Sequence, residues 1–282
     1  MVHSIFVFIM LLTSILCFGV GVAVERFVLS PKADGTLCPP KLEAFVPYCV
    51  GTISEGGNHY HGGLSYGVKD GVGTYKWADG GRYTGEYRGG WIHGKGTLIW
   101  ADGSKYEGNW LFGKKDGEGK RSFKDGTLYE GVFSNDQIQK GEVITPDGTI
   151  ARGNFSNGKF DGKILINYTN GFSAETIYKE GKLLRGVQKN EAGDILYDGE
   201  YMDSKRHGKG KQYFNSGDVY EGDFIEGARD GKGIYMFVDG RRYEGAFKNN
   251  KFHGMGNMMF PDGITISGKW LEGEWSEVRV DE

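Results

Sequence analysis

The sequence predicts an all-β fold, an elongated array of stacked antiparallel β-hairpins preceded by one transmembrane helix. Three observations favour this class: a pattern of aromatic residues and glycines that recurs at a fixed interval, an apolar–polar alternation inside each copy, and an uncharged amino-terminal segment. A fixed interval of this size is typical of solenoid arrays, whose units bury their faces only against neighbouring units. Such an array presents a long surface rather than one closed pocket, which favours a binding function.

The recurring pattern divides the chain. The copy that starts at Tyr106 reads YEGNWLFGKKDGEGKRSFKDGTL, and copies follow one another every 23 residues, except that the copy starting at position 129 has 22 residues. The copies start at Tyr60, Tyr83, Tyr106, Tyr129, Ala151, Ala174, Tyr197, Tyr220, Tyr243 and Ile266, the last of them partial. We therefore expect a hydrophobic segment 1–24, a linker and cap 25–59, a repeat array 60–275 and an acidic tail 276–282.

Each copy has the pattern of two strands. In the copy from Tyr106, residues Tyr106, Gly108 and Trp110 alternate with polar residues, which is typical of a half-buried strand, and a second alternating run covers 119–123. We expect Asp125-Gly126 to form a two-residue type I′ turn into the next copy, because that turn requires positive φ. The glycines leave space beneath the aromatic rings, which should stack from copy to copy.

The Tyr-x-Gly-x-Trp/Phe, Gly-x-Gly and Asp-Gly elements together resemble the MORN (membrane occupation and recognition nexus) repeat family over residues 60–275. The resemblance implies stacked hairpins in a grooved sheet that serves protein binding, dimerisation and membrane association. The copies from 129, 151 and 174 depart from the pattern, because Glu142, Ile164 and Val187 stand where the second loop glycine belongs. We expect this middle stretch to form a bend, a bulged site or a partner-specific surface.

The amino-terminal segment has two interpretations. Residues 5–24 are 20 consecutive uncharged residues, the length of a bilayer-spanning helix. The alternative is a cleaved signal peptide with Gly21-Val22-Ala23 as its cleavage site. Because Arg26, Lys32 and Lys41 follow the segment and no Lys or Arg precedes it, the positive-inside rule places the repeats in the cytoplasm. The alternative is a secreted or lumenal protein after signal cleavage.

The cysteines leave the compartment open. Cys38 and Cys49 would pair in a lumenal protein and stay reduced in a cytoplasmic one. The tripeptides Asn154-Phe155-Ser156 and Asn167-Tyr168-Thr169 are glycosylation sequons that matter only on the lumenal side, and two such sequons arise readily by chance.

No catalytic, cofactor-binding or metal site is predicted. His93, His207 and His253 occupy the eleventh place of their copies, where other copies have Asp, so we interpret them as polar residues that start a turn. His59 and His61 could offer two metal ligands, but no third ligand follows at a suitable spacing, and we expect a polar strand edge instead. The Asp residues at the eleventh place are Asp70, Asp116, Asp161 and Asp230.

The candidate binding residues are basic and lie at the ninth and tenth places of the copies. Because the interval is constant, we expect them to align along one edge of the array, opposite the Asp-Gly turns. They are Lys114, Lys115, Lys159, Lys205, Arg206, Arg229 and Lys251, with Lys69 at the equivalent place of the first copy. The net charge of -3 argues against a dedicated nucleic-acid binder.

The sequence therefore predicts a non-enzymatic scaffold, anchored in a membrane through residues 5–24, whose repeats bind protein partners. A binder of phosphoinositides or other acidic phospholipids is the alternative, since each Lys or Arg near an anionic leaflet contributes about 1 kcal/mol. An accessory structural subunit of a larger membrane complex is a third interpretation.

Overall fold

The structure, a computed structural model, describes residues 37–38 and 47–276. All of them belong to one compact unit, Ala33–Glu282. This part of the chain contains only strands and connections, so it has no helix that is long and apolar enough to cross a membrane. The predicted membrane segment, residues 5–24, lies outside the described residues.

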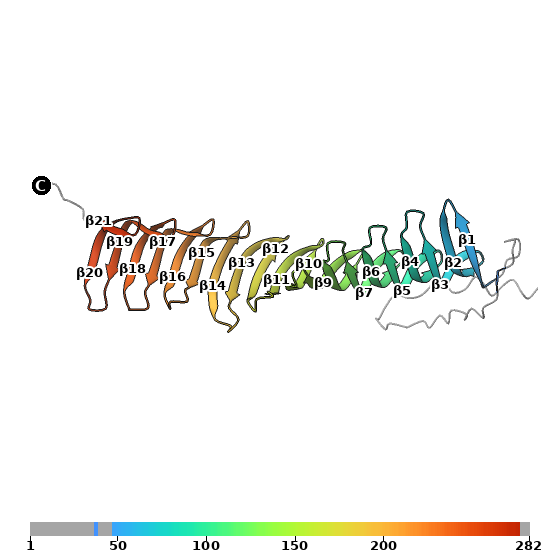
Figure 1. The fold of residues 1–282 in the computed structure, drawn as a ribbon, viewed down its shortest axis with the longest axis horizontal. Coiled ribbons are helices and arrows are strands. Elements are labelled where there is room, and N and C mark those ends of the chain that lie inside the picture. Colours follow the sequence, from blue (N-terminus) through green and yellow to red (C-terminus); the bar gives the residue numbers. More distant parts are fainter. Residues whose placement is uncertain (1–36, 39–46, 277–282) are drawn as a thin grey trace, which may run out of the picture. The chain divides into compact units, whose positions relative to one another are not determined.

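A single sheet of 21 strands contains every described element, and neighbouring strands follow one another in chain order (Figure 1). Each strand pairs antiparallel with the next one along the chain, so every pairing is local. The all-β array of hairpins predicted from the repeats is thereby confirmed. The strands are β1 (Cys49–Glu55), β2 (Asn58–Ser65), β3 (Val68–Lys76), β4 (Arg82–Arg88), β5 (Trp91–Ile99), β6 (Lys105–Leu111), β7 (Lys114–Ser122), β8 (Leu128–Ser134), β9 (Gln137–Ile144), β10 (Ile150–Ser156), β11 (Lys159–Asn167), β12 (Ser173–Lys179), β13 (Lys182–Lys189), β14 (Ile195–Met202), β15 (Lys205–Tyr213), β16 (Val219–Ile225), β17 (Ala228–Met236), β18 (Arg242–Lys248), β19 (Lys251–Met259), β20 (Thr265–Leu271) and β21 (Glu274–Ser276).

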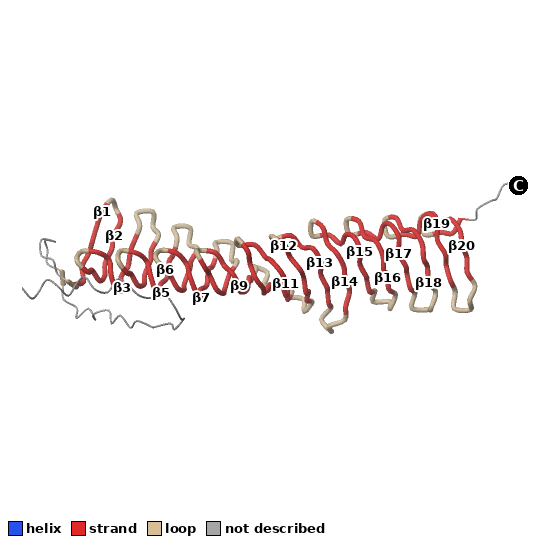
Figure 2. The backbone as a smooth tube through the Cα atoms, turned by 180° about the vertical axis from the view of Figure 1, so that it is seen from behind, coloured by secondary structure: helices blue, strands red, loops and turns tan. Residues whose placement is uncertain are grey.

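Two kinds of connection alternate along the sheet (Figure 2). Within a repeat, two residues join the strands and both have positive φ, as in Asn249 (48°) and Asn250 (71°). This is the backbone of a type I′ turn. Between repeats the connection is longer, and Asp125-Gly126 lies inside it with only Gly126 at positive φ (91°).

The prediction of a two-residue turn at Asp125-Gly126 is therefore wrong. The loop is closed by a hydrogen bond from the Phe123 amide to the Thr127 carbonyl, 2.8 Å. The Asp125 carboxylate accepts the Thr127 N–H at 2.9 Å, so the aspartate stabilises a wider loop through its side chain.

The two spaced glycines of each repeat have different roles. In the repeat from Tyr106, Gly108 pairs with Gly119 and Trp110 pairs with Lys115, so the second strand carries two extra residues between these pairs. This β-bulge contains Gly117 at φ 98°, a conformation that favours glycine.

The second glycine gives room to a ring. Six of the seven first-place tyrosines are fully buried, and each of these, such as Tyr106 and Tyr220, lies over a cross-strand pair of glycines, whereas Tyr129 is half-buried. A Cβ atom at Gly233 would lie 2.5–2.7 Å from atoms of Tyr220. The Tyr220 hydroxyl donates a 2.8 Å hydrogen bond to the carbonyl of Asp223, which satisfies the one polar atom of the ring.

The expected contact between rings of successive repeats is present, in edge-to-face geometry. The Tyr106 ring lies 5.0 Å from Trp110 in its own repeat and 5.2 Å from Phe133 in the next. These contacts form two hydrophobic clusters, one whose buried residues run from Cys49 to Phe155 and one from Tyr197 to Trp270. The first cluster extends into the repeats from 129 and 151, so the interruption lies between Phe160 and Tyr197.

The middle repeats replace the tyrosine and glycines by other means. In the repeat from Ala151, the fully buried Ile164 fills the space that the ring occupies elsewhere and packs over Gly153. In the repeat from Ala174, the buried Thr176 lies opposite Gly186 and donates a hydrogen bond to the Ile164 carbonyl at 2.9 Å.

The sequence suggested that three repeats had lost the second loop glycine. In two of them the glycine is present but displaced by one position along the chain. Gly141 pairs with Gly131, and Gly186 pairs with Thr176, because β9 and β13 each have one residue fewer than the nine of the strand β11. The bulge is shorter there, so Glu142 and Val187 do not occupy the glycine position. Only Ile164 takes that position.

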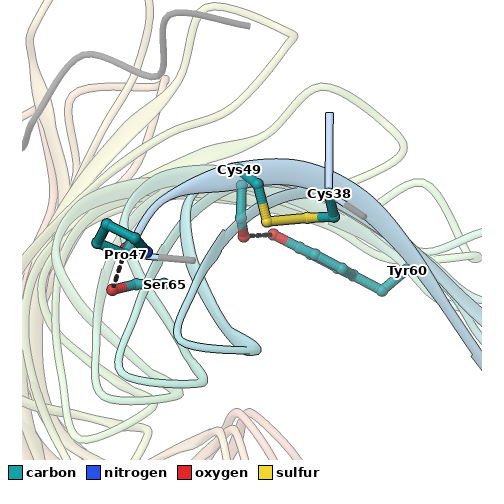
Figure 3. The surroundings of a disulfide bond; sticks show 6 residues. Cys38, Pro47, Cys49, Tyr60 and Ser65 are labelled. Carbon is teal, nitrogen blue, oxygen red and sulfur yellow. Dashed lines mark hydrogen bonds between the residues drawn. A yellow bond between two sulfur atoms is a disulfide. The ribbon is translucent and has the colours of Figure 1, made fainter. Parts of the chain in front are cut away.

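A disulfide bond ties the segment before the repeats to the first strand (Figure 3). Cys38 and Cys49 are joined with their Cα atoms 4.9 Å apart, and the Cys38 amide donates to the Val50 carbonyl at 3.0 Å. The strand β1 lies within the range 25–59, which the sequence suggested as linker and cap, and it pairs with β2 over seven residues.

Candidate binding surface

The sheet has two faces with different chemistry. We call the side that carries the first-place tyrosines the ring face, and the opposite side the open face. Successive residues of a strand point to opposite faces, so each place before the bulge, the ninth and tenth places included, belongs to one face throughout the array. The structure therefore assigns every predicted binding residue to a face.

The tenth-place residues lie on the ring face. Lys115 is only 7% exposed, its ammonium group lies 5.8 Å from the centres of the Trp100 and Tyr106 rings, and it pairs with Asp136 at 3.1 Å. The half-buried Arg206 lies over the Tyr197 ring at 4.4 Å.

Arg229 and Lys69 repeat this arrangement. Arg229 lies over three rings, at 5.2 Å from Phe214, 5.4 Å from Tyr235 and 5.7 Å from Tyr220. Lys69 lies 4.4 Å from the centre of Tyr75, and desolvation by burial lowers the pKa of its ammonium group. These four cations pack against the core through cation–π contacts.

The ninth-place lysines are exposed and point the other way. They are Lys114, Lys159, Lys205 and Lys251, each the first residue of its strand. Lys205 pairs with Glu226 at 3.4 Å, and Lys251 pairs with Glu272 at 2.9 Å, both glutamates being in the turn of the next repeat. The structure thus divides the predicted basic edge between two faces, and the role of these residues in binding stays a prediction.

The eleventh-place residues connect the turns of successive repeats. The Asp230 carboxylate accepts the N–H of Asn249 at 3.2 Å, and the Arg229 carbonyl accepts the N–H of Asn250 at 3.0 Å. His93 makes the corresponding contact, its Nδ1 lying 3.5 Å from the amide nitrogen of Phe112. Asp230 and His93 thus both place an acceptor against the next turn, whereas the buried Nδ1 of His253 has no hydrogen-bond partner within the described residues.

His59 and His61, which the sequence offered as two metal ligands, are bonded locally. His59 lies 2.9 Å from the hydroxyl of Ser54, and His61 lies 3.0 Å from that of Thr52. Within residues 37–38 and 47–276, no group of three or more His, Cys, Asp or Glu side chains could hold a metal ion.

A groove of about 810 Å³ lies on the open face, and its lining residues run from Arg185 to Met255. Its floor is the backbone of the glycine pairs, such as Gly222 and Gly233, whose missing side chains would point to the ring face. Met255, 66% exposed, and the half-buried Ile234 add apolar surface to the lining.

Cross-strand ion pairs border this groove. Lys209 pairs with Asp223 at 2.6 Å, Lys211 with Glu221 at 3.2 Å, and Arg185 with Asp198 at 2.7 Å. Basic and acidic side chains therefore alternate around an apolar and backbone floor, which is the composition of a protein-binding surface with a polar rim. The family resemblance implied a grooved sheet, but the sequence did not identify these lining residues, because they come from seven strands and meet only through the register.

A smaller hollow of about 440 Å³ opens at the middle repeats. Tyr129, Phe155 and Phe160 line it together with residues of two turns. Here Ala151 and Ala174 replace first-place tyrosines, so less ring surface covers the sheet.

These features define a class of protein, a β-hairpin repeat array in which most units share one first-place tyrosine and one cross-strand pair of glycines. Seven matches to the MORN repeat model cover residues 60–82, 83–105, 106–128, 152–163, 197–219, 220–241 and 243–265. The chain belongs to the MORN repeat family. The search of curated proteins found no match.

Several solved structures share partial similarity with the chain. One is the TCP domain of SAS-4 (dCPAP) of Drosophila melanogaster in complex with a proline-rich motif of Ana2 (dSTIL), 12% identical, covering 55% of this chain and 86% of that chain with a TM-score of 0.35. Another is a catalytically inactive virginiamycin B lyase from Staphylococcus aureus with quinupristin, 15% identical over 78% of this chain and 83% of that chain with a TM-score of 0.16. Because these scores are below 0.5, we base no inference on them.

Proposed function

We propose that this protein is a non-enzymatic scaffold, anchored in a membrane through residues 5–24, whose repeat array binds protein partners. The observation that carries the proposal is the groove on the open face, with its glycine-backbone floor and its border of paired charges. Its volume lies in the range of well-formed ligand sites, but it is open and distributed over seven strands. An extended segment of a partner protein fits such a surface better than a small substrate does.

The experiment compares two positions at the fifteenth place of their repeats. Ile234 lies in the groove lining, and Thr97 lies at the same place of an earlier repeat outside it. Full-length protein would be purified in mild detergent from its native membranes, and the proteins bound to it identified by mass spectrometry. We expect Ile234→Arg to lose a defined partner and Thr97→Arg to keep it. Equal recovery of every partner with both variants would contradict the proposal for the groove.

Acidic-lipid binding is the second candidate, and the equivalent positions of Lys114, Lys159, Lys205 and Lys251 favour it. At about 1 kcal/mol per basic residue, four lysines assist a tethered protein. However, Glu226 and Glu272 pair with two of them and reduce the local field. The contribution expected from this edge is therefore small.

Vesicles test the lipid candidate. Replacing the four ninth-place lysines by Glu should abolish binding to phosphatidylserine vesicles, and the binding of the unaltered protein should decrease with salt. Lys115 and Arg206 are left unchanged because they pack on the ring face. If the unaltered protein binds phosphatidylcholine vesicles equally well, the edge has no role in lipid recognition.

A further inference from the structure

The hairpin β10–β11 carries both glycosylation sequons of the chain, and its register places their asparagines on one face. On β10, Arg152 and Asn154 are exposed while Phe155 is buried, so Asn154 belongs to the open face. Asn167 is the last residue of β11 and pairs with Ile150 of β10. Ile150 lies two residues before Arg152 and four residues before Asn154, so the three side chains belong to the same face. Since cross-strand partners share a face, Asn167 also points to the open face.

Both side chains are accessible. Asn154 and Asn167 are exposed, and neither side-chain amide takes part in a hydrogen bond within the described residues. Tyr168 and Thr169, which complete the second sequon, are also exposed and begin the loop that is closed by the Tyr168 amide and the Phe172 carbonyl at 2.9 Å. A glycan at either asparagine would therefore displace nothing from the core.

A second, independent observation concerns the compartment. The bond between Cys38 and Cys49 joins the amino-terminal segment to β1, and such bonds persist in oxidising compartments. A sequon is used only by a chain that enters the secretory pathway, which is such a compartment. The disulfide and the two accessible asparagines thus require the same surroundings, although they lie about a hundred residues apart in the sequence.

We propose that Asn154 and Asn167 are N-glycosylated, and that the repeat array lies on the lumenal or extracellular side of its membrane. Of the two orientations that the sequence left open, this is the lumenal one. The proposed glycosylation does not depend on the proposed partner-binding groove. The groove is lined by residues from Arg185 onward, and no residue of β10 or β11 belongs to its lining. Glycans on β10–β11 therefore leave the groove open to a protein in the same compartment.

The experiment expresses the full-length chain, with a carboxy-terminal tag, in cultured animal cells. Digestion with peptide N-glycosidase F should increase its gel mobility, and partial digestion should give two steps. Asn154→Gln and Asn167→Gln should each remove one step, and the double variant should show none. Asn170→Gln, in the same loop but outside a sequon, is the matched control and should keep both steps. If the unaltered chain shows only one step, one of the two asparagines is not glycosylated. It is the asparagine whose substitution by Gln leaves that step in place, and the proposal is overturned for that residue.

A reporter variant makes a negative result decisive. Lys251→Thr creates a sequon at Asn249, an exposed residue at the tip of a turn. In a lumenal array this variant gains a third step. If it gains a step while the unaltered chain has none, the natural asparagines are not modified and the proposal of the two sites is overturned.

Thiol labelling gives an independent reading of the compartment. In a Cys17→Ser background, Cys38 and Cys49 should react with a maleimide only after reduction. Immediate reaction of both thiols, together with no mobility step for the Lys251→Thr variant, would show a cytoplasmic array and overturn the whole proposal.

Discussion

At the scale of single residues, the repeat depends on a match between one ring and two glycines. Tyr220 lies over Gly222 and Gly233, and both glycine positions are too close to the ring for a Cβ atom. The repeat from Ala151 has the opposite choice, a small residue at the first place and the large Ile164 at the glycine position. Either combination fills the same volume, so the two positions should be coupled energetically.

A double-mutant cycle tests this coupling. Gly233→Ile alone should destabilise by about 1–3 kcal/mol through overpacking, and Tyr220→Ala alone by about 3–5 kcal/mol through the cavity that it leaves. The double variant should be more stable than the sum predicts, by about 0.5–3 kcal/mol, because isoleucine then occupies the space of the ring. Urea unfolding followed by tryptophan fluorescence would measure this. Additive effects would mean that the two side chains do not compete for one space.

Lys114 and Lys115 are neighbours in the sequence but should differ in their effect on stability. Lys115 is buried against two rings and pairs with Asp136, whereas Lys114 is exposed and bonds to the Asn135 side chain. We expect Lys115→Ala to cost about 1–2 kcal/mol, the usual range for a charged hydrogen bond with a cation–π contact. Lys114→Ala should change the melting temperature hardly at all, and equal effects would contradict the division of these residues between two faces.

The buried tyrosines should make the protein sensitive to alkali. Burial raises the pKa of Tyr106 and of Tyr243 to about 12, from an ordinary value of 10.0. The folded state therefore holds protons that the unfolded state has released, so stability should fall as the pH rises from about 10 toward 12. Below pH 10 this contribution is fully present. Absorbance of tyrosinate, recorded together with circular dichroism, should show ionisation and unfolding at the same pH, and ionisation of most tyrosines near pH 10 in a folded protein would contradict the buried assignment.

At the scale of elements, the sequence predicted the strands better than their connections. The alternation in Tyr106, Gly108 and Trp110 identifies a strand because burial is periodic, and β6 covers those residues. An Asp-Gly pair, in contrast, suits a two-residue turn and also a longer loop in which the aspartate accepts a backbone N–H. Only the register of the flanking strands selects between them, and that register is a property of the whole hairpin.

The same limit applies to the predicted basic residues. Lys114 and Lys115 were expected in a loop, where neighbouring side chains can share an edge. They are the first two residues of β7, so the period of two sends them to opposite faces. The constant interval predicted correctly that equivalent residues align from repeat to repeat, but not on which face.

The link between successive turns gives a prediction at this scale. In Asp230→Ala, the N–H of Asn249 loses its acceptor, while the N–H of Asn250 keeps the Arg229 carbonyl. If that hydrogen bond contributes about 1 kcal/mol, the Asn249 amide should exchange with solvent about fivefold faster. The Asn250 amide serves as an internal control in the same turn. Exchange of both amides at unchanged rates would show that the carboxylate does not hold the turn.

At the scale of the whole array, every described strand pairs with its neighbours, but the aromatic core does not run through. Ring contacts continue from Tyr129 through Phe155 and Phe160 to Tyr178. The buried residues between the two clusters, however, include Ile164, Ala174 and Thr176, which carry no rings. The sequence marked this stretch as atypical through its replaced glycines, but the expectation was a bend, a bulged site or a partner-specific surface, not a break in the aromatic core. It could not predict the groove nearby, because the groove needs the bulges and register of seven strands.

Because each repeat is stabilised only by its neighbours, the array should unfold first at the repeats with the fewest stabilising contacts between them. We expect amides of β11, β12 and β13 to exchange faster than those of the flanking strands β6 and β17, although all of these strands pair with their neighbours on both sides. Hydrogen exchange of the full-length protein, read by mass spectrometry, would measure this directly. A minimum of protection over residues 161–190 would show that two aromatic clusters fold as separate cooperative units, each with its own response to a core substitution. Equal protection along the sheet would instead mean that Ile164 and Thr176 couple the repeats as strongly as the rings do, and that the array unfolds as one.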